Sequence, residues 1–299
     1  MVFGFVPAII RIQDLPPMPQ VVSKILQLDE NNVELSSDQL QALVSVDPAL
    51  TAKIMKMANS AFFARSRKVS TLSQAITLLG FRTIKSLTLL VSASDLYNAK
   101  KAKKKIRKEL WMRSVLAALT ARVLAEKAGK NHIREDCFVT GLMKNVGRLI
   151  MLLHAPDAYA DIYSHSENGY KEDTLHTLEE KVFGITSPEV SRMALQEWNF
   201  PEVVIQSTYT SFKTPIESPE DMNPIHLLTI LAERYVFFKN LTGTFDLPEP
   251  EKEKLLALFV HDARTLNFSH EIFEFILTDL YKQIKEDDFY HFTSEIFSL

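Results

Sequence analysis

The sequence has little cysteine, little glycine and no excess of positive charge. Its single cysteine, Cys137, excludes an internal disulfide and a cysteine-based zinc cluster, and it fits a reducing cytoplasm. Eight glycines against 13 prolines leave few positions for tight β-turns, and 46% hydrophobic with 24% charged residues favours a helical globular protein. The formal net charge of −3 provides no overall basic field for nucleic acid or anionic lipid.

Long apolar runs are also missing. No segment approaches the ~18 consecutive apolar residues that a membrane-spanning helix needs. The apolar stretch 1–10 has no basic segment before it and no small-residue cleavage site, and Pro7 interrupts it. We expect this stretch to be a packing arm, the alternative being an anchor for a partner, and we expect the chain to be soluble and cytoplasmic without a membrane span.

Helix-start and helix-stop signals recur along the chain instead. Asp47-Pro48 pairs an N-cap acceptor with a proline at the first helical position, and Gly80 ends a short helix that Thr71 opens. The patterns predict an all-α protein in three parts: an N-terminal lobe at 1–105, a second helical lobe at 106–245 and a C-terminal extension at 246–299. The main expected helices are Phe81 to Tyr97, 110–124, 136–153, 223–239, 250–259 and 269–284.

A basic run precedes the second lobe. It consists of Lys100, Lys101, Lys103, Lys104, Lys105, Arg107 and Lys108. Such runs are usually solvated, so a solvated connection between the lobes is the first interpretation. The alternatives are a docking strip for an acidic partner or for a nucleic-acid backbone. Nucleic acid is the weaker alternative, because no stacking aromatic residue is interleaved with the run before Trp111.

The segment from Gly141 to Gly147 has the shape of a metal-binding motif without metal-binding side chains. Its two glycines bracket an apolar segment, and Lys144 and Asn145 stand where a His-Asp pair would hold a divalent cation. An ammonium group at pH 7 cannot coordinate a metal, and a carboxamide replaces a charge with a dipole.

Several motifs in order and at consistent spacing resemble the HDOD family, the output-domain branch of the HD metal-dependent phosphohydrolase superfamily in bacterial signalling proteins. The resemblance covers roughly Leu15 to Phe212. The matching segments are Leu15-Pro16-Pro17-Met18-Pro19, Asp47-Pro48-Ala49-Leu50, Ala58-Asn59-Ser60-Ala61-Phe62-Phe63, Ala75-Ile76-Thr77-Leu78-Leu79-Gly80, Gly141-Leu142 with Val146-Gly147, and Trp198-Asn199-Phe200-Pro201-Glu202. The resemblance implies a helical N-terminal lobe packed on an HD-like helical bundle.

The resemblance also allows a comparison of metal-site positions. In active HD enzymes a histidine after a tryptophan, the His-Asp pair and a late aspartate hold the metal, which activates water for attack on a phosphate ester. The aligned positions here are Arg113, Lys144, Asn145 and, for a further family histidine, Ser187. Only the last acidic position has an acid, Glu233. We therefore expect no metal, no cofactor and no catalysis, and we hypothesise that Arg113 and Lys144 neutralise Glu233.

The leading expectation is a free-standing, non-catalytic signalling protein that presents helical surfaces to a regulatory protein partner. The candidate surfaces are the basic run and the groove between the lobes, with Asn59 and Ser60 nearby, although helix capping is the preferred role for these two. The alternatives are a divergent phosphohydrolase acting on a nucleotide or cyclic dinucleotide, and nucleic-acid binding through the basic run. His261-Asp262 is a literal His-Asp dipeptide, but it lacks a second histidine at helical spacing and is not expected to bind metal.

Overall fold

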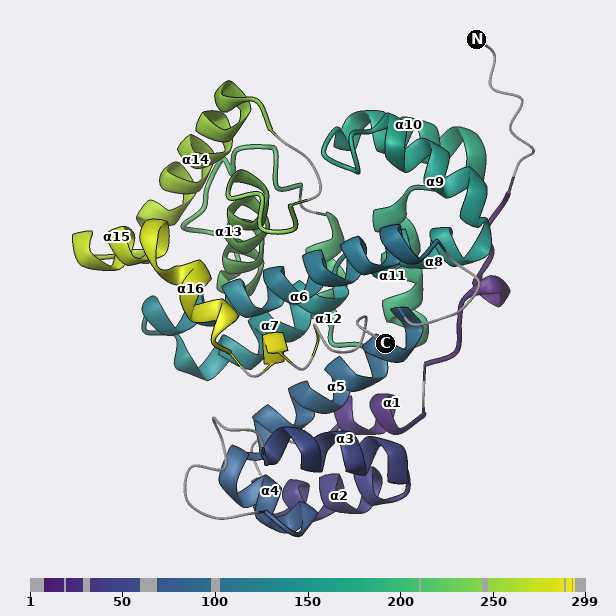
Figure 1. Cartoon of the computed structure of the whole chain (residues 1–299), viewed down its shortest axis with the longest axis vertical. Helices are drawn as coiled ribbons and strands as arrows, with labels where there is room; N and C mark the ends of the chain where they lie inside the picture. Colours follow the sequence, from purple (N-terminus) through teal and green to yellow (C-terminus); the bar gives the residue numbers. More distant parts are fainter. Residues whose placement is uncertain are drawn as a thin grey trace.

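The computed structural model of the chain describes residues 8–18, 20–28, 33–59, 69–97, 103–209, 211–243, 247–287, 289–291 and 293. Within these ranges the secondary structure is α-helix with short 3-10 turns and no strand, which confirms the all-α prediction. Figure 1 shows α1 to α5 gathered as one lobe against a larger helical body that α6 crosses.

The N-terminal lobe contains five helices among the described residues. They are α1 (Gln20–Leu26), α2 (Val33–Ser45), α3 (Pro48–Ala58), α4 (Leu72–Leu79) and α5 (Phe81–Tyr97). The side chain of Asp47 caps α3 by accepting hydrogen bonds from two backbone N–H groups, at 2.9 and 3.0 Å. Gly80 ends α4 with a φ of 83°, a conformation that glycine adopts without a steric cost, and α5 begins at the next residue as predicted.

Asn59 joins the end of α3 to the segment that precedes α4. Its side-chain amide donates to the carbonyl groups of Met55 at 2.9 Å and Val69 at 2.8 Å, and its oxygen accepts from the Val69 N–H group at 2.8 Å. This bonding agrees with the capping role that the sequence favoured for Asn59. Ser60, named with it as a partner-binding candidate, lies outside the described residues.

The central bundle surrounds α6, whose apolar face is buried along most of its length. Its helices are α6 (Lys104–Lys127), α7 (Arg134–Met143), α8 (Val146–His154), α9 (Pro156–His165), α10 (Glu172–Phe183), α11 (Ser187–Glu197), α12 (Glu202–Gln206) and α13 (Pro224–Phe238). The 3-10 turns are η1 (Ile12–Asp14), η2 (Asn131–Ile133), η3 (Ser207–Tyr209) and η4 (Arg264–Leu266). The helix expected over 110–124 corresponds to α6, which extends beyond these bounds at both ends and begins inside the basic run.

The helix expected over 136–153 is two helices. The chain leaves the α7 axis at Lys144 and Asn145, and α8 begins at Val146. The apolar pattern continues through this break, so hydrophobicity alone did not reveal it. The break turns two polar side chains toward the bundle interior, where they meet Glu233 of α13.

The C-terminal helices pack on the central bundle. They are α14 (Glu249–Ala263), α15 (His270–Thr278) and α16 (Leu280–Lys285), and the helix expected over 269–284 is therefore interrupted at Asp279. Arg234 of α13 is fully buried and forms an ion pair with Asp262 of α14. Its guanidinium group also donates to the carbonyl groups of Phe212 at 2.7 Å, Thr214 at 2.6 Å and Leu258 at 3.1 Å. The three-part division at 105 and 245 stays a prediction.

Each of the two tryptophans donates a hydrogen bond to a segment near a different end of the chain. The indole N–H group of Trp198 donates to the carbonyl group of Pro16 at 3.1 Å. That of Trp111 donates to the carbonyl group of Thr293 at 3.4 Å. Both rings are buried, at 3% and 0% exposure respectively.

Among the described residues, no single helix has the length and apolar composition needed to cross a membrane; one bent pair, α4 with α5 at 113°, passes by length and composition alone.

Candidate functional site

The positions that resemble the His-Asp pair meet the late acidic position in space. The ammonium Nζ of Lys144 lies 2.6 Å from Oε2 of Glu233, and the amide Nδ2 of Asn145 lies 2.5 Å from Oε1 of the same carboxylate. The side chains of Lys144 and Glu233 are only 4% and 6% exposed. Both carboxylate oxygens of Glu233 therefore bind side chains from the break between α7 and α8.

Arg113 has a carboxylate partner of its own. One turn earlier on α6, Glu109 forms an ion pair with the Arg113 guanidinium at 2.9 Å, and both side chains are buried. The guanidinium also donates to the carbonyl group of Asn168 at 3.0 Å and lies 4.6 Å from the centre of the Phe237 ring. Of the two cations that we expect to neutralise Glu233, Lys144 forms an ion pair with it, and Arg113 forms an ion pair with Glu109.

Ser187 lies at the start of α11, where Gly147 of α8 packs against it. A Cβ atom added to Gly147 would lie 2.0 Å from the carbonyl oxygen of Ser187, and the Gly147 N–H group donates to the hydroxyl group of Ser191 at 2.8 Å. A Cβ atom on Gly141 would likewise lie 2.8 Å from backbone atoms of Ala118 in α6. The two glycines of the motif therefore permit close helix packing.

Sequence reasoning missed four charged residues of this region: Glu109, described above, and Arg148, Glu172 and Glu179. Arg148 of α8 lies 3.4 Å from Glu172 of α10, whose other carboxylate oxygen accepts a hydrogen bond from Ser211. Glu179 accepts from the N–H group of Ser187 at 2.7 Å. A signal was present, because Arg148 interrupts an otherwise apolar segment, and Glu172 and Glu179 are seven residues apart on one helix face.

These groups form one continuous buried cluster, which we call the central polar cluster. A Cβ atom on Gly169 would lie 3.2 Å from Nη1 of Arg148 and 3.6 Å from Nη1 of Arg113, so both guanidinium groups lie beside the same glycine. Glu172 also interacts electrostatically with Glu233 and Lys144. The cluster consists of the acids Glu109, Glu172, Glu179 and Glu233 and the bases Arg113, Lys144 and Arg148.

The acids of the central polar cluster outnumber its bases by one. Burial raises the pKa of Glu179 to about 7 and raises the pKa of Glu172, in both cases against the opposing effect of the Arg148 charge. Three buried atoms here, Oε1 of Glu179, the hydroxyl of Tyr159 and Nε of Arg148, have no hydrogen-bond partner among the described residues. A proton on Glu179 gives the cluster equal numbers of positive and negative charges, which a low-dielectric interior favours.

The cluster does not fit a divalent metal. Glu233, the single carboxylate at the aligned positions, already binds an ammonium group that a dication would repel. Elsewhere in the part of the chain that the structure describes, no three His, Cys, Asp or Glu side chains are grouped as a metal site would require. Asp262 of the His261-Asp262 dipeptide is buried against Arg234, with His261 Nδ1 2.6 Å from it.

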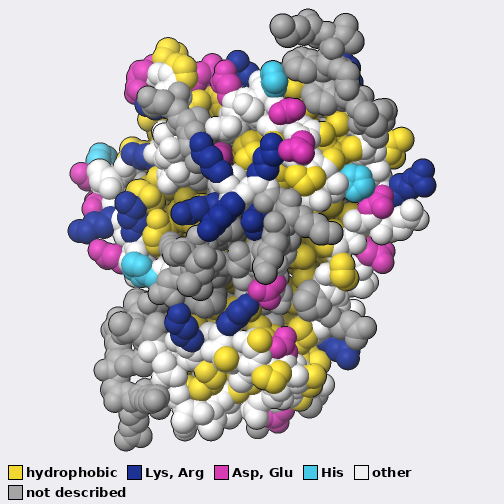
Figure 2. Space-filling view, turned by 45° about the vertical axis from the view of Figure 1, so that its right-hand side comes forward, with side chains coloured by type: hydrophobic (Ala, Val, Ile, Leu, Met, Phe, Trp, Pro, Cys, Tyr) yellow, Lys and Arg dark blue, Asp and Glu magenta, His cyan; other side chains and the backbone are white. Residues whose placement is uncertain are grey.

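The residues of the basic run differ in their surroundings. Lys100 and Lys101 lie outside the described residues, whereas Lys103, Lys104, Lys105 and Lys108 are exposed around the first turns of α6. Arg107 was expected on the docking strip, but it is buried and donates to the carbonyl group of Tyr97 at 2.7 Å. Lys103 forms an exposed ion pair with Asp157 at 2.9 Å. Figure 2 shows lysine and arginine side chains gathered near the middle of one face of the molecule.

Known proteins are similar to this chain in sequence and in fold. Over 237 residues it is 27% identical to an uncharacterised protein of Treponema pallidum, an alignment that covers 79% of this chain and 43% of the relative. The chain thus spans less than half the length of that curated relative. Two solved structures share the fold and cover 95% of this chain. An HDOD domain protein of unknown function from Geobacter sulfurreducens has a TM-score of 0.73 at 22% identity, with 94% of its own chain covered. A proposed phosphohydrolase from Shewanella amazonensis has a TM-score of 0.66 at 16% identity, with 96% covered.

The family model for the HDOD domain matches residues 15–212, a range that includes the N-terminal lobe and most of the central polar cluster but ends before Glu233. The helical lobe on a helical bundle, the two close-packing glycines and the capped helices agree with this match. The chain belongs to the HDOD family.

Proposed function

We propose that the chain is a non-catalytic regulatory protein that acts through protein–protein interaction in bacterial signalling. The observation that supports this proposal is the buried bonding of Glu233 to Lys144 and Asn145. A catalytic dication activates water only where several lone-pair donors hold it. At the aligned positions an ammonium, an amide, a guanidinium and a hydroxyl group leave one carboxylate, which is already paired.

The first test concerns metal binding and catalysis. The purified protein, dialysed against manganese, iron or nickel, is measured for bound metal and for turnover of bis(p-nitrophenyl) phosphate. We expect bound metal well below one ion per chain and no turnover above that of the Glu233→Gln variant. Stoichiometric metal with turnover would instead establish the alternative, a divergent phosphohydrolase acting on a nucleotide or cyclic dinucleotide.

The second test concerns the partner surface. The exposed lysines at the start of α6 provide a local positive surface on an acidic chain, which suits an acidic protein partner. The test variant carries Lys104, Lys105 and Lys108→Gln, and the matched control carries Lys181, Lys254 and Lys282→Gln, three lysines exposed on other helices. Partners recovered from native cells are compared for wild type and both variants.

We expect the α6 variant alone to lose a partner that the wild type and the control retain, and we expect that loss to be reproduced by raising the salt concentration. Retention of the same partner by both variants would refute a role for these lysines and direct attention to the groove between the lobes. Recovery of RNA or DNA in place of protein, lost only from the α6 variant, would favour nucleic-acid binding.

A further inference from the structure

The C-terminal helices α15 and α16 carry a hollow at the surface of the molecule. Figure 1 shows α15 at the outer edge of the molecule, with α16 leading back toward α6. The hollow has a volume of about 530 Å³ and lies along α15. Its lining consists of Phe268, Ser269, His270, Phe273, Glu274, Leu277 and Thr278. None of these residues belongs to the central polar cluster or to the basic run.

The helical repeat continues from α15 into α16. The N–H group of Asp279 donates to the carbonyl group of Phe275 at 2.8 Å, and the N–H group of Gln283 donates to the carbonyl group of Asp279 at 3.0 Å. These hydrogen bonds have the spacing of four residues that defines an α-helix. Side chains spaced by three or four residues therefore form rows that run along both helices.

One of these rows is apolar. Phe273, Leu277 and Tyr281 follow one another at intervals of four residues, and all three are half-buried. The ring of Phe273 packs edge-to-face on Phe259 of α14, with 6.1 Å between the ring centres, and the hydroxyl group of Tyr281 donates to the carbonyl group of Leu241 at 3.4 Å. The row is thus fixed to the body of the molecule while its outer side borders the hollow. An apolar row of this kind is typical of an interaction surface.

The row beside it is exposed, and its charge changes sign along its length. We call it the charged row; it contains Glu271 and Glu274 on α15, Thr278 at its centre, and Lys282 and Lys285 on α16, all exposed. Glu274 and Lys282 each lie four residues from Thr278, and Glu271 and Lys285 each lie seven residues from it. The charged row is therefore complementary in charge to a copy of itself that runs in the opposite direction.

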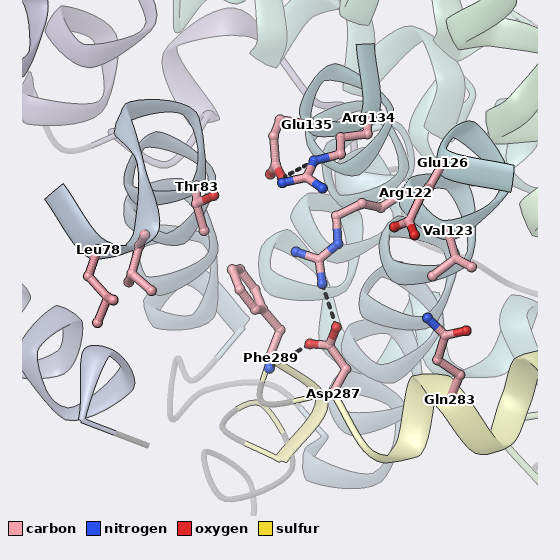
Figure 3. Close-up of a pocket in the computed structure, with 11 residues that line it drawn as sticks. Leu78, Thr83, Arg122, Val123, Glu126, Arg134, Glu135, Gln283, Asp287 and Phe289 are labelled. Carbon is pink, nitrogen blue, oxygen red and sulfur yellow. Dashed lines mark hydrogen bonds and ion pairs between the residues drawn. The ribbon is translucent and has the colours of Figure 1, made fainter. Parts of the chain in front are cut away.

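The other sides of α16 do not interrupt this pattern. Asp279 and Glu286 are exposed acids, but each is about 100° around the helix from its neighbour in the charged row, on the side away from the apolar row. Figure 3 shows Gln283 and Asp287 on the side that faces α6, where Asp287 binds Arg122 at 2.6 Å. The charged row and the apolar row thus lie together on the outer side of these helices.

We propose that α15 and α16 bind a second copy of this chain in an antiparallel, two-fold symmetric contact. With the two-fold axis beside Thr278, Glu274 of each copy lies opposite Lys282 of the other, and Glu271 lies opposite Lys285. The same axis places the two apolar rows against each other, because a two-fold contact joins the same surface of both copies. Each hollow is then covered by the apolar row of the other copy.

The symmetric order of the charges favours a second copy over an unrelated partner. A basic partner would complement only the two acids of the charged row, and an acidic partner only its two lysines. An antiparallel copy complements all four charges at once. The contact uses none of the lysines at the start of α6, so the proposal does not depend on the proposed function.

The length of the contact sets its expected strength. From Glu271 to Lys285 the charged row spans about 21 Å at ~1.5 Å per residue. Specific interfaces bury ~1,200–2,000 Å² in total, and a pair of such short helices lies at or below the lower end of that range. We therefore expect a dimer that dissociates on dilution, with a dissociation constant in the micromolar range.

The test measures the mass of the whole chain by sedimentation equilibrium, from low micromolar to near-millimolar concentration. We expect the wild type to change from monomer to dimer as its concentration rises, with weaker association at higher salt concentration. The acid-reversed variant carries Glu271→Lys and Glu274→Lys, and the base-reversed variant carries Lys282→Glu and Lys285→Glu. Each places like charges opposite each other at every charged contact of the dimer, so each should weaken self-association by about tenfold or more.

A mixture of the two reversed variants separates this contact from a folding defect. One variant has four lysines in the charged row and the other four glutamates, so an equimolar mixture should form a one-to-one dimer although each variant alone is monomeric. The control carries Glu180→Lys and Glu253→Lys, exposed acids of α10 and α14, and should associate as the wild type does. A wild type that is monomeric at all concentrations, a dimer that both reversed variants retain, or reversed variants that do not associate when mixed would overturn the proposal.

Discussion

At the scale of single residues, a position that aligns with a metal ligand of HD enzymes holds a buried lysine, Lys144. The Lys144 ammonium is paired with Glu233, and Asn145 satisfies the second carboxylate oxygen. A buried ion pair is weak evidence for stability, because desolvation of both charges opposes their attraction. Removing only one partner of the pair is strongly destabilising, because the other charge then stays buried and unpaired.

We therefore expect Lys144→Met to lower the free energy of unfolding by about 3–5 kcal/mol. Removing both charges, as Lys144→Met with Glu233→Gln, should recover a large part of that loss. The measurement is urea denaturation, with the exposed Lys105→Met as a control expected within about 0.5 kcal/mol of wild type. A loss at Lys144 no greater than at Lys105 would show that the pair does not form.

We expect Glu179 to make the free energy of unfolding depend on pH. Burial raises its pKa from 4.5 to about 7, so the folded state binds its proton more tightly than the unfolded state does. Its contribution to stability is therefore fully present below about pH 4.5 and is lost as the pH rises through about 7.

Relative to wild type, Glu179→Gln should become more stable as the pH rises from 5 to 8, by roughly 3 kcal/mol at most. Unfolding is followed by urea denaturation at each pH. The neighbouring, exposed Glu180→Gln is the matched control. The same pH dependence in both variants would mean that the proton of Glu179 is not linked to folding.

At the scale of elements, the contact between α8 and α11 depends on the lack of a side chain at residue 147. The Cβ atom of an alanine there would lie 2.0 Å from a backbone oxygen, which no rotamer change can relieve. The better helix propensity of alanine, about 1 kcal/mol, is smaller than the cost of separating two buried helices.

Gly147→Ala should consequently destabilise the protein by about 2 kcal/mol or more, measured as a fall in melting temperature and in denaturation midpoint. Gly184→Ala provides a comparison, since Gly184 has a φ of 72° but open space around its Cβ position. It should cost about 1–2 kcal/mol through backbone strain alone. If the alanine at 147 were the milder of the two, close helix packing would not be the role of that glycine.

The elements also show how far the sequence allows prediction. Asp47, Thr71 and Gly80 act on neighbouring backbone atoms, and the helices that they delimit were predicted correctly. The break at Lys144 was missed because the apolar pattern continues through it, and Glu233, which pairs with Lys144, is 89 residues away. The same reason applies to Arg148, whose partner Glu172 lies on another helix. The partner of Arg113 differs, because Glu109 is four residues earlier on the same helix and an i, i+4 pattern predicts such a pair.

At the scale of the whole molecule, a buried ion pair connects α14 of the C-terminal helices to α13 of the central bundle. The family match ends at residue 212, yet Arg234 and Asp262, which lie beyond it, form a fully buried ion pair. Arg234 also holds the carbonyl groups of Phe212 and Thr214. We infer that α13 and α14 are part of the same folding unit as the matched region.

Asp262→Asn should therefore lower the stability of the entire chain by about 3–5 kcal/mol, because it leaves the Arg234 guanidinium buried without a counter-charge. The loss of stability is measured by monitoring thermal unfolding with circular dichroism. Glu253→Gln is the control, since Glu253 is an exposed acid on the same helix. A separate, early transition confined to the C-terminal helices would contradict a single folding unit.

The two tryptophans give the molecule an optical property. Only two are present, and each indole binds a carbonyl group near a different end of the chain, Pro16 for Trp198 and Thr293 for Trp111. Buried indoles emit at shorter wavelengths than indoles in water. A Trp111→Phe protein would therefore report, by fluorescence, release of the N-terminal segment, and a Trp198→Phe protein release of the C-terminal segment. The chain carries its own pair of terminus-specific reporters.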